Sequence, residues 1–234
     1  MSKKMYEFIG KTINPISGKC QYECKYCYVE KMKKRFSHIN KKYSGQPAID
    51  FSAFKSYKKE ELIFVGSCID MFADNVHNVQ IRFVLEHLSN FDKPQFLFQT
   101  KNPKRFNSFY IPENSILCVT IETDDEEVYK DVSKSNILQR IEDIKEYRKK
   151  QILIENILKT KTHPLHITIE PIMKFTPYFI KTLRCLMPDQ VNIGADSGKN
   201  KLIEPNKDEI LNIIKELEKF TKVHIKETLH RLIK

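Results

Sequence analysis

Short apolar runs alternate with longer amphipathic segments along most of this chain. The short runs are rich in β-branched and aromatic residues and end in polar or turn residues, whereas the longer segments repeat their apolar residues every three or four positions. The predicted strands are 61–67, 95–100, 115–122, 165–170, 190–195 and 222–227. The predicted helices are 78–91, 136–159, 176–187 and 206–220. This alternation predicts an α/β fold in which helices cover a parallel sheet.

The chain of 234 residues, 41% of them hydrophobic, is long enough to bury a full core. No internal repeat, low-complexity tract or Gly/Ser linker interrupts the alternation, so we predict one domain over residues 1–234. Short residue patterns predict where two of the helices begin. Thr176 is followed by Pro177, and Asn206 has Glu209 three residues later, as in a capping box.

Polar residues stand where each predicted strand ends. Right-handed crossovers bring the carboxyl ends of parallel strands to one edge of a sheet, where such folds place their sites. Any single strand must end in something polar, but six successive polar ends favour a shared cavity. The residues at these ends are Ser67, Cys68, Asp70, Gln99, Thr100, Lys101, Glu122, Glu170, Asp196, Ser197 and Lys226.

Three of the six cysteines, Cys20, Cys24 and Cys27, stand within eight residues. Six cysteines are too few for a disulfide scaffold, so the cluster indicates a metal or redox site. A structural zinc would need a fourth ligand, for which His38 is the nearest candidate. A redox pair would use Cys24 and Cys27 and leave Cys20 unexplained. An iron–sulfur cubane would use all three thiolates and leave one iron open to an external ligand.

The other cysteines are scattered. Cys118 and Cys185 lie among apolar residues, and we expect both to be inert core thiols. Cys68 follows Ser67 at a strand end, where we expect packing, with a thiol that faces the cavity as the alternative.

The spacing Cys20-x3-Cys24-x2-Cys27, with the aromatic Tyr26 before the third cysteine, resembles the signature of the radical S-adenosylmethionine (SAM) superfamily. The resemblance implies a partial (β/α)6 TIM-like barrel with an iron–sulfur cluster loop after the first strand, at about residues 14–36. It implies a 4Fe–4S cluster held by the three cysteines, with SAM on the fourth iron. In that superfamily, electron transfer into SAM breaks a carbon–sulfur bond and yields a 5′-deoxyadenosyl radical, which abstracts hydrogen from a substrate.

Further blocks resemble a small, largely uncharacterised radical-SAM group common in phages and prokaryotic genomes. They are INPISGKCQYECKYCY (13–28), GSCIDMF (66–72), QTKNPKR (99–105), VTIE (119–122), TIEPI (168–172), GADSG (194–198) and IKE (225–227). Two departures from the pattern matter. Glu23 stands where a glycine is common, and GSCID replaces the Gly-Gly-Glu often seen after the second strand.

The resemblance also implies roles for individual residues. It places the backbone around Tyr26 against adenine, Ser67 and Asp70 at the methionine end of SAM, and Thr100 and Glu122 at its amino-acid or ribose groups. Lys101 and Ser197 join these cofactor-binding residues. The candidates for catalysis on the substrate side are Cys68, Glu170, Asp196 and Lys226. Glu170 and Lys226 could equally form a buried ion pair with each other.

The net charge of +10 permits a polyanionic partner, although the abundance of lysine that low-GC genomes or growth at high temperature can produce would also account for it. Basic clusters at 30–35, 101–105 and 146–151 would favour a nucleotide, DNA or RNA substrate if they converge. The resemblance implies a reductant such as flavodoxin or ferredoxin. No apolar run is long enough to cross a membrane, and the first residues lack a secretory h-region, so we expect a cytoplasmic protein.

The sequence therefore favours a radical SAM enzyme with an anionic or nucleic-acid-derived substrate. Two alternatives stay open. One is an activase that generates a glycyl radical on a partner protein. The other is a zinc-stabilised nucleic-acid-binding module without turnover.

Overall fold

The structure is a computed structural model that describes residues 6–160 and 162–234. The chain divides into two compact units. Among the described residues, the first unit contains those up to Gln21 together with Cys27–Leu117, and the second contains Tyr22–Tyr26 and those from Cys118 to Lys234. The predicted single domain, 1–234, includes residues outside the described ones. That the whole chain forms one domain stays a prediction.

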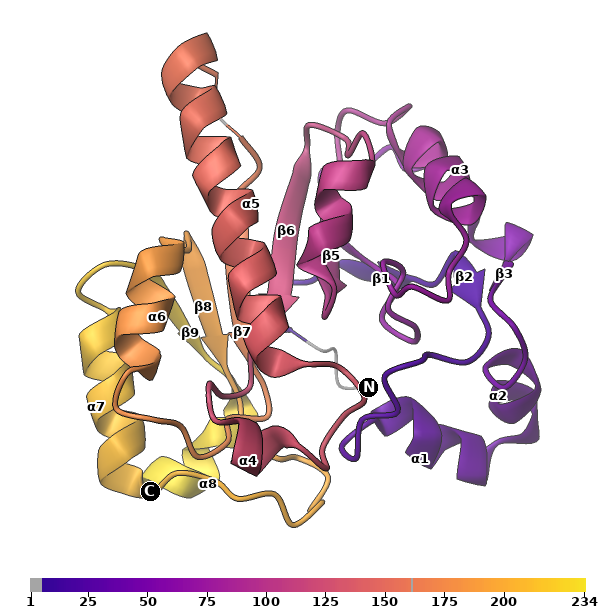
Figure 1. Cartoon of the computed structure of the whole chain (residues 1–234). Helices are drawn as coiled ribbons and strands as arrows, with labels where there is room; N and C mark the ends of the chain where they lie inside the picture. Colours follow the sequence, from indigo (N-terminus) through magenta and orange to yellow (C-terminus); the bar gives the residue numbers. More distant parts are fainter. Residues whose placement is uncertain (1–5, 161) are drawn as a thin grey trace. The chain divides into compact units, whose positions relative to one another are not determined.

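The main sheet has seven strands in the order β1-β4-β5-β6-β7-β8-β9. Within the first unit, β1 pairs with β4 and β4 with β5, and both ladders are parallel. Within the second unit, β7 pairs with β8 and β8 with β9, again in parallel. The predicted α/β fold with a parallel sheet is thus confirmed (Figure 1).

The first unit contains the short strands and helices around the cysteine loop. Its strands are β1 (Lys11–Ile13), β2 (Ile16–Ser17), β3 (Ala48–Ile49), β4 (Leu62–Val65) and β5 (Gln95–Thr100), and β2 pairs antiparallel with β3. Its helices are α1 (Tyr28–Arg35), α2 (Ser37–Lys42) and α3 (Asn78–Leu88), with 3-10 helices η1 (Phe51–Ala53) and η2 (Pro103–Ser108). β6 (Ser115–Thr120) begins in this unit and ends in the second.

The second unit contains β7 (Leu165–Ile169), β8 (Gln190–Ile193) and β9 (Lys222–Ile225). Its helices are α4 (Glu126–Tyr129), α5 (Ile137–Leu158), α6 (Phe179–Leu186), α7 (Lys207–Leu217) and α8 (His230–Ile233), with the 3-10 helix η3 (Glu227–Leu229). The last turns of α5 expose Leu153, Ile157 and Leu158. None of the helices in the described part of the chain combines the length and apolar character that crossing a bilayer requires.

Every predicted strand and helix is present, with ends that differ by a few residues. The capping box at the start of α7 is confirmed, because Asn206 Oδ1 accepts from the Glu209 N–H at 2.9 Å and the Glu209 carboxylate accepts from the Asn206 N–H at 2.9 Å. The start predicted at Thr176 is wrong, since α6 begins at Phe179. Thr176 instead donates from its N–H and hydroxyl to the Asp124 carboxylate, at 2.8 and 2.6 Å.

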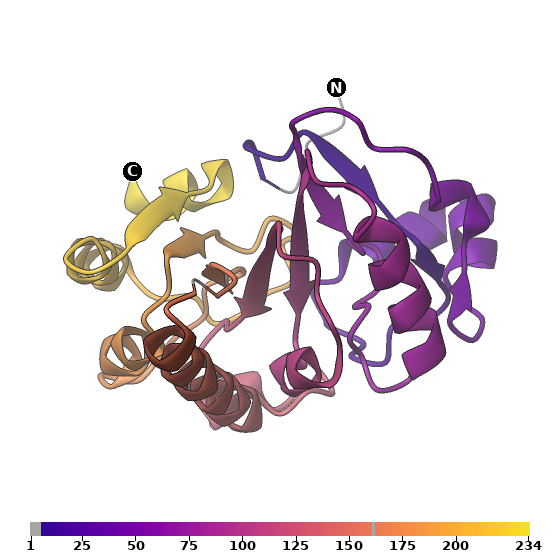
Figure 2. The same cartoon turned by 90° about the horizontal axis from the view of Figure 1, so that it is seen from above.

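The sheet of the second unit has one apolar face and one polar face. Helices α5, α6 and α7 lie side by side along one side of β7–β9 (Figure 2). On the polar face, the register sets Thr168 beside Asn192, whose amide donates to the Thr168 hydroxyl at 3.3 Å. The Gln190 amide donates in turn to Asn192 Oδ1 at 2.8 Å. Buried amide and hydroxyl groups thus satisfy one another along β8 and between β8 and β7.

His166 on this polar face makes the stability of the fold sensitive to acid. Burial lowers the pKa of His166 to about 4, against an ordinary value of about 6.5. Between these values the unfolded chain binds a proton that the folded chain does not, so stability falls as the pH drops from about 6.5 to about 4, by about 3 kcal/mol at most. Urea midpoints at pH 7.5 and 5.0 should therefore differ less for His166→Gln than for the wild type. Equal pH dependence in the two proteins would contradict this assignment.

Candidate functional site

The loop after β4 carries the first group of predicted site residues. Gly66 has a φ of 81°, and its N–H donates to the Ile13 carbonyl at the end of β1 at 2.8 Å. The Oδ1 atom of Asn14, just after β1, accepts from the Cys68 N–H at 2.9 Å and from the Ser67 hydroxyl at 3.2 Å. One amide side chain therefore holds Ser67 and Cys68 at the end of β1.

The start of α1 meets the same loop. The hydroxyl of Tyr28 donates to the Ser67 carbonyl at 2.9 Å and lies 3.6 Å from the Cys68 sulfur. Cys68 is half-buried and also lies 3.8 Å from the Ser67 hydroxyl. Its thiol is thus partly exposed and has two hydroxyl neighbours. Because Tyr28 directly follows Cys27, these contacts fix the end of the cysteine loop to the end of β4.

Asp70 joins the ends of β4 and β5. Its carboxylate accepts from the Thr100 hydroxyl at 2.8 and 3.0 Å, from the Lys101 N–H at 2.7 Å and from the Phe72 N–H at 3.0 Å. Burial raises the pKa of Asp70, and these donors act in the opposite direction. The structure brings together the predicted residues Asp70, Thr100 and Lys101, and it uses Asp70 and Thr100 to order two loops.

Gly18 sets the path of the chain into the cysteine loop. Its φ is 105°, and a Cβ atom there would lie 2.6 Å from the carbonyl oxygen of Gln46. The next residue, Lys19, donates from its N–H to the Gly45 carbonyl at 2.7 Å. Glycine is required at position 18 both for the backbone conformation and for this close approach. Cys20 therefore follows a tightly fixed stretch of backbone.

Residues 22–25 belong to the second unit, where they pair with the segment after α4. The Lys25 N–H donates to the Val132 carbonyl, and the Lys134 N–H donates to the Tyr22 carbonyl, both at 2.8 Å. Glu23 has a φ of 44°, in the left-handed region that glycine favours. The glycine common at this position in the resembled group thus has a conformational reason, and Glu23 adopts the same region.

Glu122, just after β6, lies at the centre of a buried polar network. Its carboxylate accepts from Arg140 Nη1 at 2.7 Å, from the Tyr129 hydroxyl at 3.1 Å and from the Tyr26 hydroxyl. The relative exposures of Glu122 and Arg140 are 0% and 1%. Burial raises the pKa of Tyr26, and Glu122 beside it raises it further. Sequence reasoning missed Arg140, although its place among apolar residues of α5 was a usable signal.

Glu170 and Lys226 form an ion pair at the ends of β7 and β9. Burial raises the pKa of Glu170, whereas Lys226 acts to lower it. A Cβ atom on Gly194 would lie 2.7 Å from Glu170 Oε1, so glycine leaves room for the carboxylate. Glu170 and Lys226 thus form the mutual ion pair that the sequence suggested as an alternative to contact with the substrate.

Asp196 orders the loop that follows β8. Its carboxylate accepts from the Gly198 N–H at 3.0 Å and from the N–H of Asn200. Its own N–H donates to the Glu204 carboxylate at 2.8 Å, and Arg231 donates to its carbonyl at 3.1 Å. Asp196 is buried and Ser197 is exposed. Asp196 thus has a clear local role, and Ser197 presents its hydroxyl at the surface.

The predicted metal ligands are divided between the units, with Cys20 and Cys27 in the first and Cys24 in the second. All three are half-buried, and none forms a disulfide within the described residues. Across residues 6–160 and 162–234, no three His, Cys, Asp or Glu side chains gather closely enough to hold a metal ion. Three reduced sulfurs on one irregular loop still match the donor chemistry of an iron–sulfur cluster.

The outcomes for the remaining cysteines differ. Cys118 is buried on β6, 3.2 Å from the Thr168 hydroxyl, as expected of a core thiol. The expectation for Cys185 is wrong, because this residue is exposed on α6. The buried residues of that helix are Phe179, Leu183 and Leu186, so position 185 falls on its outer face.

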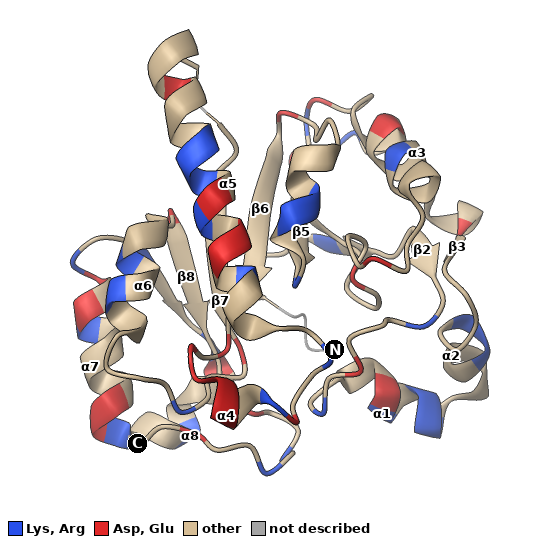
Figure 3. Ribbon diagram, in the orientation of Figure 1, with Lys and Arg blue, Asp and Glu red and all other residues tan. Residues whose placement is uncertain are grey.

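The basic clusters are not uniform positive surfaces. Residues of both charge signs are interspersed along α5, which carries the 146–151 cluster (Figure 3). In the 101–105 cluster, Arg105 Nη1 donates to backbone carbonyls of the 72–76 loop, including that of Val76 at 3.0 Å. Arg105 is therefore occupied in holding that loop.

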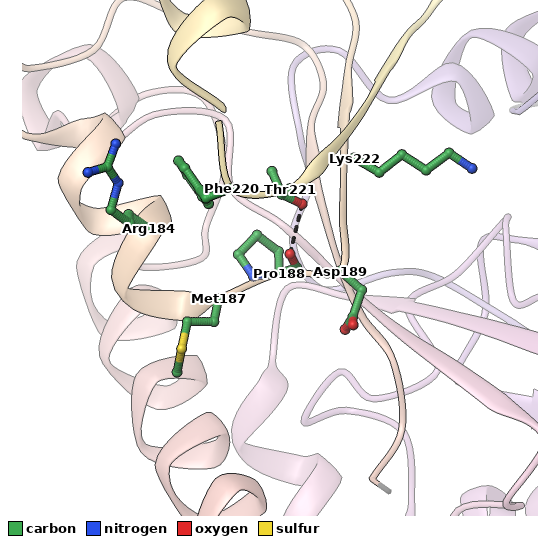
Figure 4. Close-up of a pocket in the computed structure, with 7 residues that line it drawn as sticks. All are labelled: Arg184, Met187, Pro188, Asp189, Phe220, Thr221 and Lys222. Atoms are coloured by element: carbon green, nitrogen blue, oxygen red, sulfur yellow. Dashed lines mark hydrogen bonds between the residues drawn. The ribbon is translucent and has the colours of Figure 1, made fainter. Parts of the chain in front are cut away.

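A cavity of about 480 Å³ opens in the second unit. Its lining residues are Arg184, Met187, Pro188, Asp189, Phe220, Thr221 and Lys222 (Figure 4). Asp189 precedes β8 and Lys222 begins β9, so this cavity lies at the amino ends of these strands. It contains none of the predicted site residues, which lie on the cysteine loop or at or after the carboxyl ends of strands.

Comparisons with known proteins give one family and a set of similar folds. The family model described as "Protein of unknown function (DUF5131)" matches residues 3–208. No curated protein matches the chain. Several solved structures are similar at low sequence identity, and they therefore support the fold alone.

Several of these structures are of spore photoproduct lyase. A double mutant with bound AdoMet and dinucleoside spore photoproduct is 10% identical, with a TM-score of 0.59 over 92% of this chain and 75% of that one. The lyase complexed with dinucleoside spore photoproduct is also 10% identical, with a TM-score of 0.54 over 90% and 74%. SuiB of Streptococcus suis is 9% identical, with a TM-score of 0.50 over 94% of this chain and 49% of that one.

Proposed function

The chain belongs to the family described as Protein of unknown function (DUF5131), and we propose that it is a radical SAM enzyme acting on an anionic or nucleic-acid-derived substrate. The observation that carries the proposal is the set of three reduced thiols, Cys20, Cys24 and Cys27, on the irregular loop before α1. The chain that carries this loop has an α/β fold similar to that of a lyase structure with bound AdoMet. The narrower assignments, to a partial (β/α)6 barrel and to the phage-type group, are part of the proposal.

Cys20, Cys24 and Cys27 would hold a 4Fe–4S cluster. When bound, such a cluster would supply an electron to SAM and so generate the radical that abstracts hydrogen from the substrate. The chain's own residues fix the loop on both sides. Gly18 sets its entry, and residues 22–25 pair with the segment after α4. A reductant such as flavodoxin or ferredoxin would supply the electron.

The SAM-binding residues would come from the strand ends that the structure orders. Ser67, Lys101, Ser197 and the backbone at Tyr26 would contact the cofactor. Asp70, Thr100 and Glu122 would also contact the cofactor, and their hydrogen bonds shape the binding loops beside it.

The substrate-side residues would be Cys68, Glu170, Asp196 and Lys226. Lys226 supports an anionic substrate most directly, because a phosphate or carboxylate could compete with Glu170 for its ammonium group. The net charge of +10 and the similarity to a lyase complexed with a dinucleoside support a nucleic-acid-derived substrate.

Cluster loading in cysteine variants tests this proposal. After anaerobic reconstitution, the wild type should hold about four irons and absorb visible light as 4Fe–4S proteins do. Cys20→Ala, Cys24→Ala and Cys27→Ala should each lose most of the iron, because each removes one of three protein ligands. Cys185→Ala is the matched control, since this exposed cysteine lies outside the loop.

Two outcomes would contradict the proposal. A wild-type protein that holds one zinc and no iron–sulfur chromophore would favour the nucleic-acid-binding module. If the wild type and all three loop variants held equal amounts of iron, the three cysteines would not be the cluster ligands. Co-purification of a large partner protein would instead favour the activase.

A further inference from the structure

The segment that carries Cys24 is held in register against residues 132–134. Two backbone hydrogen bonds of 2.8 Å, from Lys25 to Val132 and from Lys134 to Tyr22, flank the contact. The ammonium group of Lys134 also lies 2.6 Å from the carboxylate of Glu23. Residue 133 is therefore fixed directly opposite Cys24, although the two are 109 positions apart in the sequence.

The hydroxyl of Ser133 has several partners at this place. It lies 3.4 Å from the Cys24 sulfur and donates to the Tyr22 carbonyl at 3.0 Å. It accepts from the Ser135 N–H at 3.3 Å. In the structure the Cys24 thiol donates to the Ser133 oxygen.

A cysteine that ligates iron is a thiolate and has no proton to donate. At the same contact, only the Ser133 hydroxyl could then act as donor. The change requires rotation of one hydroxyl proton, which a serine side chain allows. The Tyr22 carbonyl would then lose the hydrogen bond from Ser133, but it would still accept one from the Lys134 N–H at 2.8 Å. The reversed hydrogen bond therefore leaves no buried polar group unsatisfied.

We propose that Ser133 donates a hydrogen bond to the Cys24 sulfur of a bound iron–sulfur cluster and raises the reduction potential of that cluster. This inference rests on the proposed function. A donor to a ligating sulfur stabilises the more negative, reduced cluster, and such hydrogen bonds are among the factors that set cluster potentials. Ser133 is thus a positioning and tuning residue that touches neither SAM nor the substrate.

Potentiometric titration of the reconstituted protein, followed by electron paramagnetic resonance, tests the inference. Ser133→Ala should retain the cluster but shift its potential to more negative values. The equilibrium constant for reduction should fall by up to about tenfold, which is about 59 mV for a one-electron couple. Ser133→Thr keeps the hydroxyl and should return the potential towards that of the wild type. A potential does not depend on the loaded fraction, so partial loading leaves the comparison valid.

An unchanged potential in Ser133→Ala would overturn the inference while leaving the proposed function intact. A potential in Ser133→Thr equal to that of a shifted Ser133→Ala would also overturn it, because loss of packing would then explain the shift. Failure of the wild type to take up any cluster would overturn the proposed function itself.

Discussion

Replacement of Arg140 by alanine is expected to lower the free energy of unfolding by about 3–5 kcal/mol. The substitution leaves the fully buried carboxylate of Glu122 without its cation. It also removes the donors to the Thr120 carbonyl, at 2.6 Å, and to the Tyr129 hydroxyl, at 2.8 Å. Urea denaturation followed by circular dichroism measures the loss.

A surface ion pair gives the matched control. Lys130 lies 2.6 Å from Glu127, but both side chains are exposed. Lys130→Ala should leave the unfolding midpoint unchanged, because exposed pairs contribute little to stability. The double variant Arg140→Met with Glu122→Gln should be more stable than Arg140→Ala alone, since no uncompensated buried charge remains. Equal small losses for Arg140→Ala and Lys130→Ala would contradict the buried network.

Gly18→Ala is expected to lower the free energy of unfolding by about 2–4 kcal/mol. Its φ of 105° is unfavourable for any residue with a Cβ atom. The new methyl group would also lie 2.6 Å from the Gln46 carbonyl oxygen and 2.7 Å from the Cα atom of Pro47. These are backbone atoms that cannot rotate away. Because Cys20 follows two residues later, the variant should also take up less iron during reconstitution.

Gly45→Ala provides the control for this prediction. It lies in the same part of the first unit, but no atom is within 4 Å of the position that its Cβ would occupy. It should change the unfolding free energy by no more than about 0.5 kcal/mol. If Gly18→Ala were as stable as Gly45→Ala, the close approach of residues 18 and 46 would not exist in the folded protein.

The order of the main strands and helices could be read from the sequence because each has a clear apolar period. The strands β1, β2 and β3 contain three, two and two residues, too few to show any period. Helix α1 buries only Val29, so its sequence lacks the apolar stripe of a core helix. These missed elements lie next to the cysteine loop, which is held by backbone contacts to residues distant in the sequence, such as those of Tyr22 and Lys25 with residues 132–134.

The candidate site was predictable in part. The sequence indicated polar residues at the strand ends, but it could not indicate which of them pair with each other. Glu122 pairs with Arg140 from α5, whereas Asp70 binds Thr100 on the neighbouring strand. Arg140 was identifiable in principle, because it stands on the same face as the buried Ile137, Ile141 and Ile144. A cation in an apolar stripe requires a buried anion. The contact between Ser133 and Cys24 could not be predicted from the sequence, because it depends on the pairing of two segments that are distant in the chain.

The most direct test of the central claim is the release of 5′-deoxyadenosine from SAM by the reconstituted protein with dithionite. We expect release by the wild type and by Cys185→Ala, and none by Cys24→Ala, with all three proteins equally folded by circular dichroism. A wild type that carries its cluster but releases no more 5′-deoxyadenosine than Cys24→Ala would contradict the assignment of radical SAM chemistry to this chain.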